Sequence, residues 1–181
     1  MKMKVAVLQT KVFADKNENL EQVKALMARE DVAACDLVTL PEMWNCPYQT
    51  ENFSIYAERE DSEFVRALAK LAKKHHVYFQ AGSIPEVDEA GHVYNTAYTF
   101  DREGKCIDKY RKVHLFDISV KGGQVFKESD TLTAGDGFRV FDTEFGKMGV
   151  NICFDIRFPE SARIPTLHGA RILMNPGAFN M

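Results

Sequence analysis

A cysteine stands where a largely apolar segment meets an expected helix start. Cys153 follows residues 149–152, and Pro159 occupies an expected first helical position, which suits its fixed φ angle and missing N–H. A thiol held at such a turn can serve as a nucleophile, and a nearby backbone N–H, such as that of Phe154, could stabilise an oxyanion. The same segment is equally consistent with Cys153 being a small buried apolar side chain.

Two other segments carry the groups that such a thiol would need. Glu42 directly follows an apolar stretch that ends at Pro41, and a partly desolvated carboxylate at a strand end can act as a general base. Lys112 lies between an expected strand and a long polar segment, where its ammonium could stabilise a developing negative charge. Taken singly, a surface glutamate and a solvated basic turn are the better interpretations of these two residues.

Together, the three segments resemble the catalytic segments of the nitrilase superfamily of carbon–nitrogen hydrolases, in the same order and with similar spacing. The resemblance implies a catalytic triad of Glu42, Lys112 and Cys153, with Glu128 as a second glutamate close to the lysine. It also implies a thioester intermediate on the cysteine and no metal or organic cofactor. The matching segments are residues 40–43, 110–117 and 149–160.

Within that superfamily, the chain looks most like the ω-amidase branch, which hydrolyses monoamides of small dicarboxylates. A substrate of that kind needs a cation, and Arg157 is the candidate, with a structural pair to Glu160 as the alternative. We expect Tyr48, Phe116 and Phe154 to line the pocket, although aromatic residues after strands are more often core residues. The segments that carry this likeness are residues 45–48, 114–117 and 176–180.

The composition excludes several other classes of function. With 45% apolar and 27% charged residues, the 181-residue chain has an ordinary globular balance, which argues against disorder. No basic cluster occurs, so nucleic acid is not an expected partner. No apolar run approaches the roughly 20 residues that a membrane-spanning helix needs, so we expect a cytoplasmic protein without a membrane partner. The four cysteines form no CxxC pair and the histidines are scattered, so reduced thiols are expected and a metal site is not.

Alternating strands and helices must position these groups. Hairpins mixed with this alternation indicate an α/β sandwich with a mixed sheet, and the resemblance implies the N-terminal two-thirds of an αββα sandwich. Residues 112–135 have weak periodicity, which predicts a long loop of the kind that is usually functional or disordered. The expected strands are residues 4–9, predicted to be buried, and 36–40, 77–84, 93–100, 105–109, 138–141, 148–152 and 171–174. The expected helices are residues 17–29, 61–75 and, more weakly, 157–168.

The chain departs from the family in length. Residues 1–181 match one carbon–nitrogen hydrolase domain that lacks the C-terminal third of the family fold, which normally supplies strands, a pocket wall and part of a dimer interface. We therefore expect unpaired sheet edges, exposed apolar surface and a weakened homodimer. The alternatives to an ω-amidase-like enzyme are a truncated, non-catalytic relative, and a nitrilase or N-carbamoyl hydrolase of the same superfamily. A further alternative is an unrelated α/β binding domain in which the three matches are accidental.

A second departure is Pro165, which falls inside the helix expected at residues 157–168. A proline within a helix removes one backbone hydrogen bond and clashes with the preceding turn, at a cost of about 3 kcal/mol. We therefore predict a kink or a break near Arg163.

Overall fold

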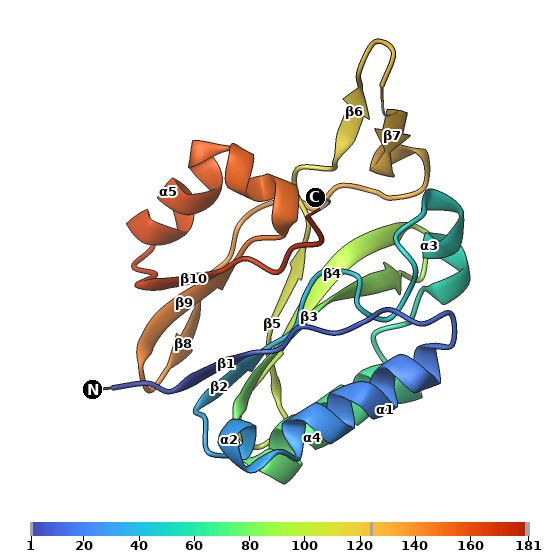
Figure 1. Ribbon diagram of the computed structural model, residues 1–181. Coiled ribbons are helices and arrows are strands. Elements are labelled where there is room, and N and C mark those ends of the chain that lie inside the picture. The colour runs from blue at the N-terminus through green and yellow to red at the C-terminus, as the bar shows by residue number, and fades with distance from the viewer. Residues whose placement is uncertain (1, 124, 180–181) are drawn as a thin grey trace.

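The computed structural model describes residues 2–123 and 125–179. Two sheets pack face to face, and helices cover their outer faces (Figure 1). This arrangement confirms the predicted αββα class. The first sheet has the order β1 (Val5–Val7), β2 (Leu37–Thr39), β3 (Tyr78–Val87), β4 (Val93–Phe100), β5 (Cys106–Arg111). The second has the order β10 (Ile172–Met174), β9 (Gly146–Val150), β8 (Phe141–Thr143).

Two long helices, α1 (Lys16–Met27) and α4 (Glu63–His75), lie side by side on the outer face of the first sheet (Figure 1). Each begins at a capping side chain: Asp15 accepts a hydrogen bond from the Asn17 N–H, and Ser62 accepts one from the Val65 N–H. The predicted apolar stripes are buried as expected, and they form a core with the sheet. Their residues are Leu20, Val23 and Met27 on α1, and Phe64, Leu68 and Leu71 on α4.

The first sheet is mixed, as the sequence indicates. Strands β1, β2 and β3 pair in parallel, whereas β3, β4 and β5 pair antiparallel. The outer face of the second sheet is covered by α5 (Pro159–Leu167), which begins at Pro159 as predicted.

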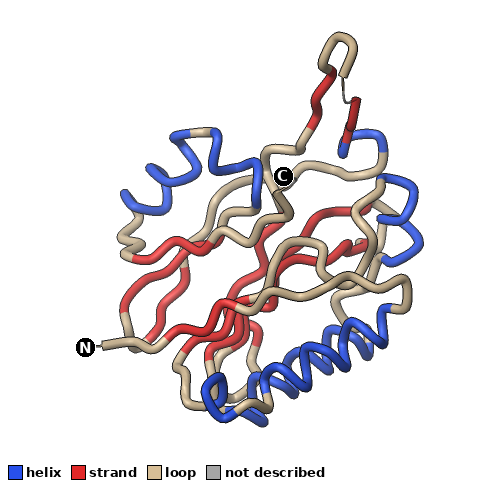
Figure 2. Tube along the Cα trace, in the orientation of Figure 1, coloured by secondary structure: helices blue, strands red, loops and turns tan. Residues whose placement is uncertain are grey.

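Several short elements were not predicted. Helices α2 (Glu30–Ala33) and α3 (Thr50–Tyr56) follow α1 and β2. The segment predicted as a loop contains a hairpin, β6 (Asp117–Ser119) and β7 (Val125–Lys127), followed by the 3₁₀ turn η1 (Glu128–Asp130). This hairpin projects from the body of the molecule as two short strands (Figure 2). A second 3₁₀ turn, η2 (Cys153–Arg157), precedes α5.

The prediction of a buried first strand is wrong. Val5 is 44% exposed and Val7 is 74% exposed, whereas Leu8, just beyond β1, belongs to the core beneath the helices. β1 is an edge strand, and the second sheet does not cover its inner face. A groove of about 430 Å³ lies there instead, with Val5 and Val7 on one side and Ile172 and Met174 of β10 on the other.

The predicted helix break near Arg163 is also wrong. Helix α5 continues through Pro165 to Leu167. Pro165 is the seventh residue of a nine-residue helix, so the one bond lost, to the Ser161 carbonyl, lies close to the helix end. A kink in the helix axis stays a prediction.

Over the described ranges, no helix is both long and apolar enough to cross a membrane.

Candidate active site

The turn that carries Glu42 is docked on a bulge of β3. The pairing of β3 with β4 shifts register between Gln80 and Ser83, and Gly82 within the shift has a φ of +61°. The Ser83 N–H donates to the Pro41 carbonyl, and a Cβ on residue 82 would lie 2.1 Å from that same oxygen. Only glycine allows so close an approach in this conformation, so Gly82 determines where the glutamate turn lies.

Lys112 is held at the end of β5 by backbone bonds on both sides. Its N–H donates to the Asn95 carbonyl, and its own carbonyl accepts from the Gly135 N–H. The side chain is fully buried, and its Nζ lies 2.8 Å from Glu42 Oε1 and 3.0 Å from Glu128 Oε2. The structure thus brings together three of the four predicted catalytic side chains.

Each carboxylate has further donors. Glu128 accepts from the Phe116 N–H at 2.6 Å and from the Tyr48 hydroxyl at 2.5 Å. Glu42 accepts from the Asn95 side-chain amide at 2.8 Å and from the Ala178 N–H at 2.9 Å. These donors compensate for burying two negative charges.

The charges in this cluster control the ionisation of Lys112. Burial alone would lower the pKa of its ammonium. The negative charges of Glu42 and Glu128 outweigh burial and raise the pKa of Lys112 above its usual range. Lys112 therefore stays positively charged at neutral pH.

Cys153 begins η2 in a conformation that is unusual for a residue with a side chain, with a φ of +43°. Its N–H donates to the Pro176 carbonyl at 2.8 Å, so that group is occupied. Burial raises the pKa of the Cys153 thiol to about 12, helped by the charge of Glu42 and a hydrogen bond to it, while Lys112 opposes the shift. The group is therefore a neutral thiol that faces a carboxylate, rather than a free thiolate.

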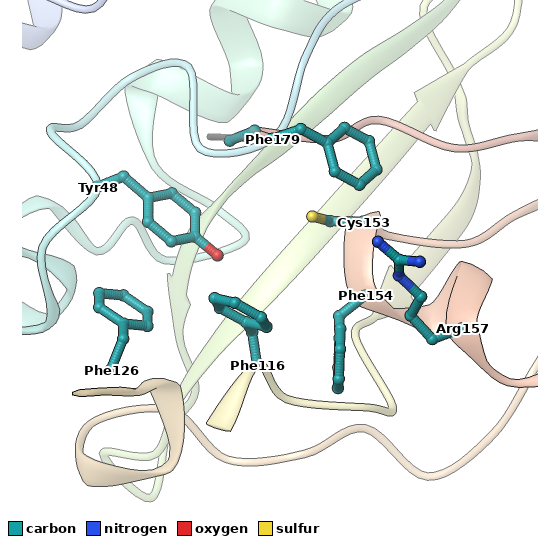
Figure 3. Close-up of a pocket in the computed structure, with 8 residues that line it drawn as sticks. Tyr48, Phe116, Phe126, Cys153, Phe154, Arg157 and Phe179 are labelled. Atoms are coloured by element: carbon teal, nitrogen blue, oxygen red, sulfur yellow. The ribbon is translucent and has the colours of Figure 1, made fainter. Parts of the chain in front are cut away.

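A cavity of about 320 Å³ opens over Cys153. All four residues predicted to contact the substrate line it, and Figure 3 shows their side chains arranged around the sulfur atom. Within residues 2–123 and 125–179, Arg157 forms no ion pair, so the alternative of a pair with Glu160 is not realised. The lining residues are Tyr48, Phe116, Phe126, Cys153, Phe154, Arg157, Ala178 and Phe179.

Several residues of this site were not predicted from the sequence. Asn95 and Ala178 both bond to Glu42, yet they lie 53 and 136 residues away from it in the chain. Asn95 alone left a signal, as a polar side chain within an otherwise buried strand. The last residue of the predicted 176–180 segment, Asn180, lies outside the described residues. Among those that are described, no group of three or more acidic, histidine or cysteine side chains could hold a metal ion.

Comparisons with known proteins agree with this geometry. The sequence profile described as carbon–nitrogen hydrolase matches residues 4–181. The chain is 44% identical over 179 residues to nitrilase homolog 2 of Dictyostelium discoideum, covering 98% of this chain and 55% of that protein. It is 42% identical over 178 residues to the omega-amidase NIT2 of Mus musculus, covering 98% of this chain and 64% of that protein.

A solved structure of the same superfamily also resembles this chain. Nit3 of Saccharomyces cerevisiae, described as a member of branch 10 of the nitrilase superfamily, superposes with a TM-score of 0.85 at 38% identity. The match covers 99% of this chain and 65% of that one. The chain thus spans between about half and two thirds of the length of these relatives.

Proposed function

Since this chain belongs to the carbon–nitrogen hydrolase family, we propose that it cleaves a small linear amide through Cys153, and that its substrate is the monoamide of a small dicarboxylic acid. One arrangement carries the proposal. The Glu42 carboxylate accepts a hydrogen bond from the Lys112 ammonium at 2.8 Å, and it raises the pKa of the Cys153 thiol, which lines the same pocket as Arg157. The ω-amidase name of a relative that is 42% identical supports the substrate class.

The first half of the reaction begins with a protonated nucleophile. Glu42 takes the thiol proton as the sulfur forms a bond with the amide carbon, and the carbonyl electrons move onto oxygen. Lys112 and the Phe154 N–H stabilise this oxyanion, and the loss of one such donor typically costs about 3 kcal/mol. The C–N bond then breaks, Glu42 gives its proton to nitrogen, and ammonia leaves behind a thioester on Cys153.

The second half regenerates the enzyme. Glu42 takes a proton from water, whose oxygen attacks the thioester carbon, and the same donors stabilise the second oxyanion. The C–S bond breaks, the sulfur recovers its proton from Glu42, and the acid leaves. Glu128 keeps Lys112 positioned and charged throughout, because it accepts a hydrogen bond from the ammonium and contributes to its raised pKa.

Arg157 provides the selectivity in this proposal. Its guanidinium lies on the pocket wall beside Phe154, and Figure 3 shows it on the same side of the pocket as the Cys153 sulfur. A substrate carboxylate at the far end of a short acyl chain would pair with it, while the aromatic rings contact the methylene groups.

The test compares two amides of similar shape. Succinamate ends in a carboxylate and butyramide ends in a methyl group, so ammonia release from the two isolates the contribution of Arg157. We expect kcat/KM to be higher for succinamate than for butyramide. Arg157→Met should lower kcat/KM for succinamate about 10-fold or more and leave kcat/KM for butyramide unchanged. Cys153→Ala abolishes turnover of both, whereas Cys106→Ser, at an exposed position away from the pocket, leaves it unchanged.

A non-catalytic relative is the second candidate, supported by the open groove beside β1. Absence of ammonia release from any small amide, by a chain that unfolds cooperatively, would favour it. Release of ammonia from a carbamoyl compound or a nitrile, but not from succinamate, would indicate a different branch of the superfamily.

Two further parts of the proposal concern the whole protein. We propose a cytoplasmic location, supported by the free thiols of Cys35, Cys46, Cys106 and Cys153. We also propose a homodimer, on the family resemblance alone, which sedimentation at several protein concentrations would test.

A further inference from the structure

A buried carboxylate that belongs to none of the predicted roles lies two residues after the nucleophile. Asp155 is fully buried and accepts four hydrogen bonds. Its Oδ1 accepts from the His114 N–H and from His114 Nδ1, both at 2.9 Å. Its Oδ2 accepts from the Tyr110 hydroxyl at 2.7 Å and from the Ile152 N–H at 2.9 Å.

These partners come from the two halves of the candidate site. Tyr110 and His114 lie two residues before and two residues after Lys112, at the end of the first sheet. Ile152 and Asp155 lie on either side of Cys153, at the end of β9 in the second sheet. One carboxylate therefore connects the segment that carries the lysine to the turn that carries the thiol.

Asp155 also closes a ring around Cys153. The Ile152 N–H donates to the Asp155 carboxylate, and the Asp155 N–H donates back to the Ile152 carbonyl at 3.0 Å. Cys153 lies inside this ring at its positive φ of +43°. A side-chain-bearing residue in that region costs about 1–3 kcal/mol and persists only where its surroundings determine the conformation.

The same network reaches the pocket wall. The His114 ring stacks on Phe158 with a centroid distance of 3.7 Å and an interplanar angle of 7°. Phe158 in turn packs edge-on against Phe154, whose ring lines the cavity.

We propose that Asp155 is a positioning residue, which fixes the direction of the Cys153 sulfur toward Glu42 and Lys112. It acts through Cys153 and does not contact the substrate. The inference rests on the proposed function, because the position of the sulfur matters only if it is a nucleophile. A misplacement of about 1 Å at a reacting atom can lower a rate about 100-fold.

The test substitution is Asp155→Asn, which keeps the shape and the Oδ1 acceptor for His114. The new NH₂ group faces the Ile152 N–H, so the ring around Cys153 opens, while the Tyr110 hydroxyl can turn to accept. Tyr110→Phe is the matched control, because it removes one donor from the same carboxylate and leaves that ring closed. His114→Phe is the second variant, since it keeps the stacking on Phe158 and removes only the imidazole bond.

The readouts are kcat and KM for succinamate, and the rate of Cys153 alkylation by iodoacetamide at each pH, followed by peptide mass spectrometry. In the unmodified protein, Glu42 takes the thiol proton, so the Cys153 rate is nearly flat between about pH 6 and pH 8.5. In Asp155→Asn, we expect kcat to fall about 100-fold with KM within about threefold. Cys153 alkylation should then rise about tenfold per pH unit, like that of an unassisted thiol.

We expect His114→Phe to lower kcat at least about fivefold, and Tyr110→Phe to change it less than that. Exposed Cys106 should give the ordinary rising profile in every variant. Asp155 would be only a structural group if Asp155→Asn lowered the melting temperature but kept the kcat and the flat profile of the unmodified protein. If Asp155→Asn fails to fold, an unchanged kcat and a flat profile in His114→Phe would overturn the proposal.

Alkylation separates this inference from the proposed function, because it requires no turnover. One outcome is that the unmodified protein releases no ammonia, yet its Cys153 alkylation rate is flat with pH and becomes pH-dependent in Asp155→Asn. That outcome contradicts the amidase proposal and supports the role of Asp155. A chain that turns over normally in Asp155→Asn contradicts the role of Asp155 and leaves the amidase proposal standing.

Discussion

Lys112 carries the only positive charge that contacts both Glu42 and Glu128 among the described residues. All three side chains are fully buried, so none of these charges is compensated by water. Removing one partner from such a cluster leaves an uncompensated charge, which costs more than the pair contributes when intact.

We therefore expect Lys112→Met to lower the free energy of unfolding by about 3–5 kcal/mol, as well as to abolish turnover. Urea unfolding at pH 7 measures the loss. Lys147→Met is the control, because Lys147 pairs with Asp142 at the surface, where an ion pair contributes about 1 kcal/mol or less. Equal losses in the two variants would contradict this account of the cluster.

Asp108 shows the opposite situation, a buried carboxyl with too few partners. Burial raises its pKa from 3.8 to about 6, against a lowering effect of Arg139. The pKa of Asp108 is higher in the folded protein than in the unfolded chain. The contribution of this group to the free energy of unfolding is therefore fully present below about pH 3.8 and is lost as the pH rises through about 6. At pH 7 the ionised Asp108 carboxylate therefore lowers the free energy of unfolding by up to about 3 kcal/mol, at about 1.4 kcal/mol per pH unit.

We expect Asp108→Asn to stabilise the protein at pH 7 by about 1–3 kcal/mol, and to have almost no effect near pH 4. Thermal unfolding across this pH range measures the difference. Asp142→Asn, at an exposed carboxylate, should change stability little at either pH. A stabilisation by Asp108→Asn that does not depend on pH would show that ionisation is not its cause.

At the scale of elements, the bulge of β3 determines the position of the Glu42 turn. Gly82 and Gly91 both have positive φ values, +61° and +87°, but a Cβ on Gly91 meets no atom within 4 Å. The two positions therefore share the conformational cost and differ in the collision with Pro41.

We expect Gly91→Ala to cost about 1 kcal/mol, and Gly82→Ala to cost at least about 2 kcal/mol more and to reduce turnover, because the glutamate turn must move. Unfolding measurements and ammonia release on both variants give the comparison. If Gly82→Ala keeps full activity, the close approach is not what positions Glu42.

Sequence patterns predicted the elements with strong periodicity. The two long helices were found to within a few residues, because each buries a continuous apolar stripe. Helix α3 was missed because its seven residues bury only Phe53, and the β6–β7 hairpin was missed because its residues alternate between exposed and half-buried. β1 was placed correctly but its burial was not, since burial depends on what lies across from it.

The candidate site was predicted only in part, because some of its contacts form between segments that are far apart in the chain. Glu42, Lys112 and Cys153 each left a local pattern, and a family resemblance joined the three. The network of Asp155 left no such pattern, because His114 is 41 residues away from it in the chain and the contact exists only in the folded molecule.

At the scale of the whole molecule, the exposed edge of the first sheet is the main liability. Among the residues that the structure describes, β1 pairs only with β2, and its two valines line the groove that β10 also lines. Unpaired strand edges with apolar side chains promote pairing with another chain.

We expect the protein to self-associate reversibly with increasing concentration, and Val7→Lys to suppress this, because a charged side chain on an edge strand opposes pairing. Sedimentation velocity at several concentrations measures the effect. Ile55→Lys is the control, since Ile55 on α3 is equally exposed, at 74%, but lies on a helix. Equal suppression by both substitutions would point to a general effect of charge.

In the proposed reaction, the thiol and its base come from different sheets, since Cys153 follows β9 of the second sheet, whereas Glu42 and Lys112 follow β2 and β5 of the first. Amide cleavage would then require both halves of the molecule, and we expect neither half alone to retain any of it. Two fragments divided between β7 and β8 would each be inert, one with a base and no nucleophile, the other with a nucleophile and no base. Amide cleavage by their mixture would count the reassembled molecules directly, which would make this site a reporter of fragment complementation.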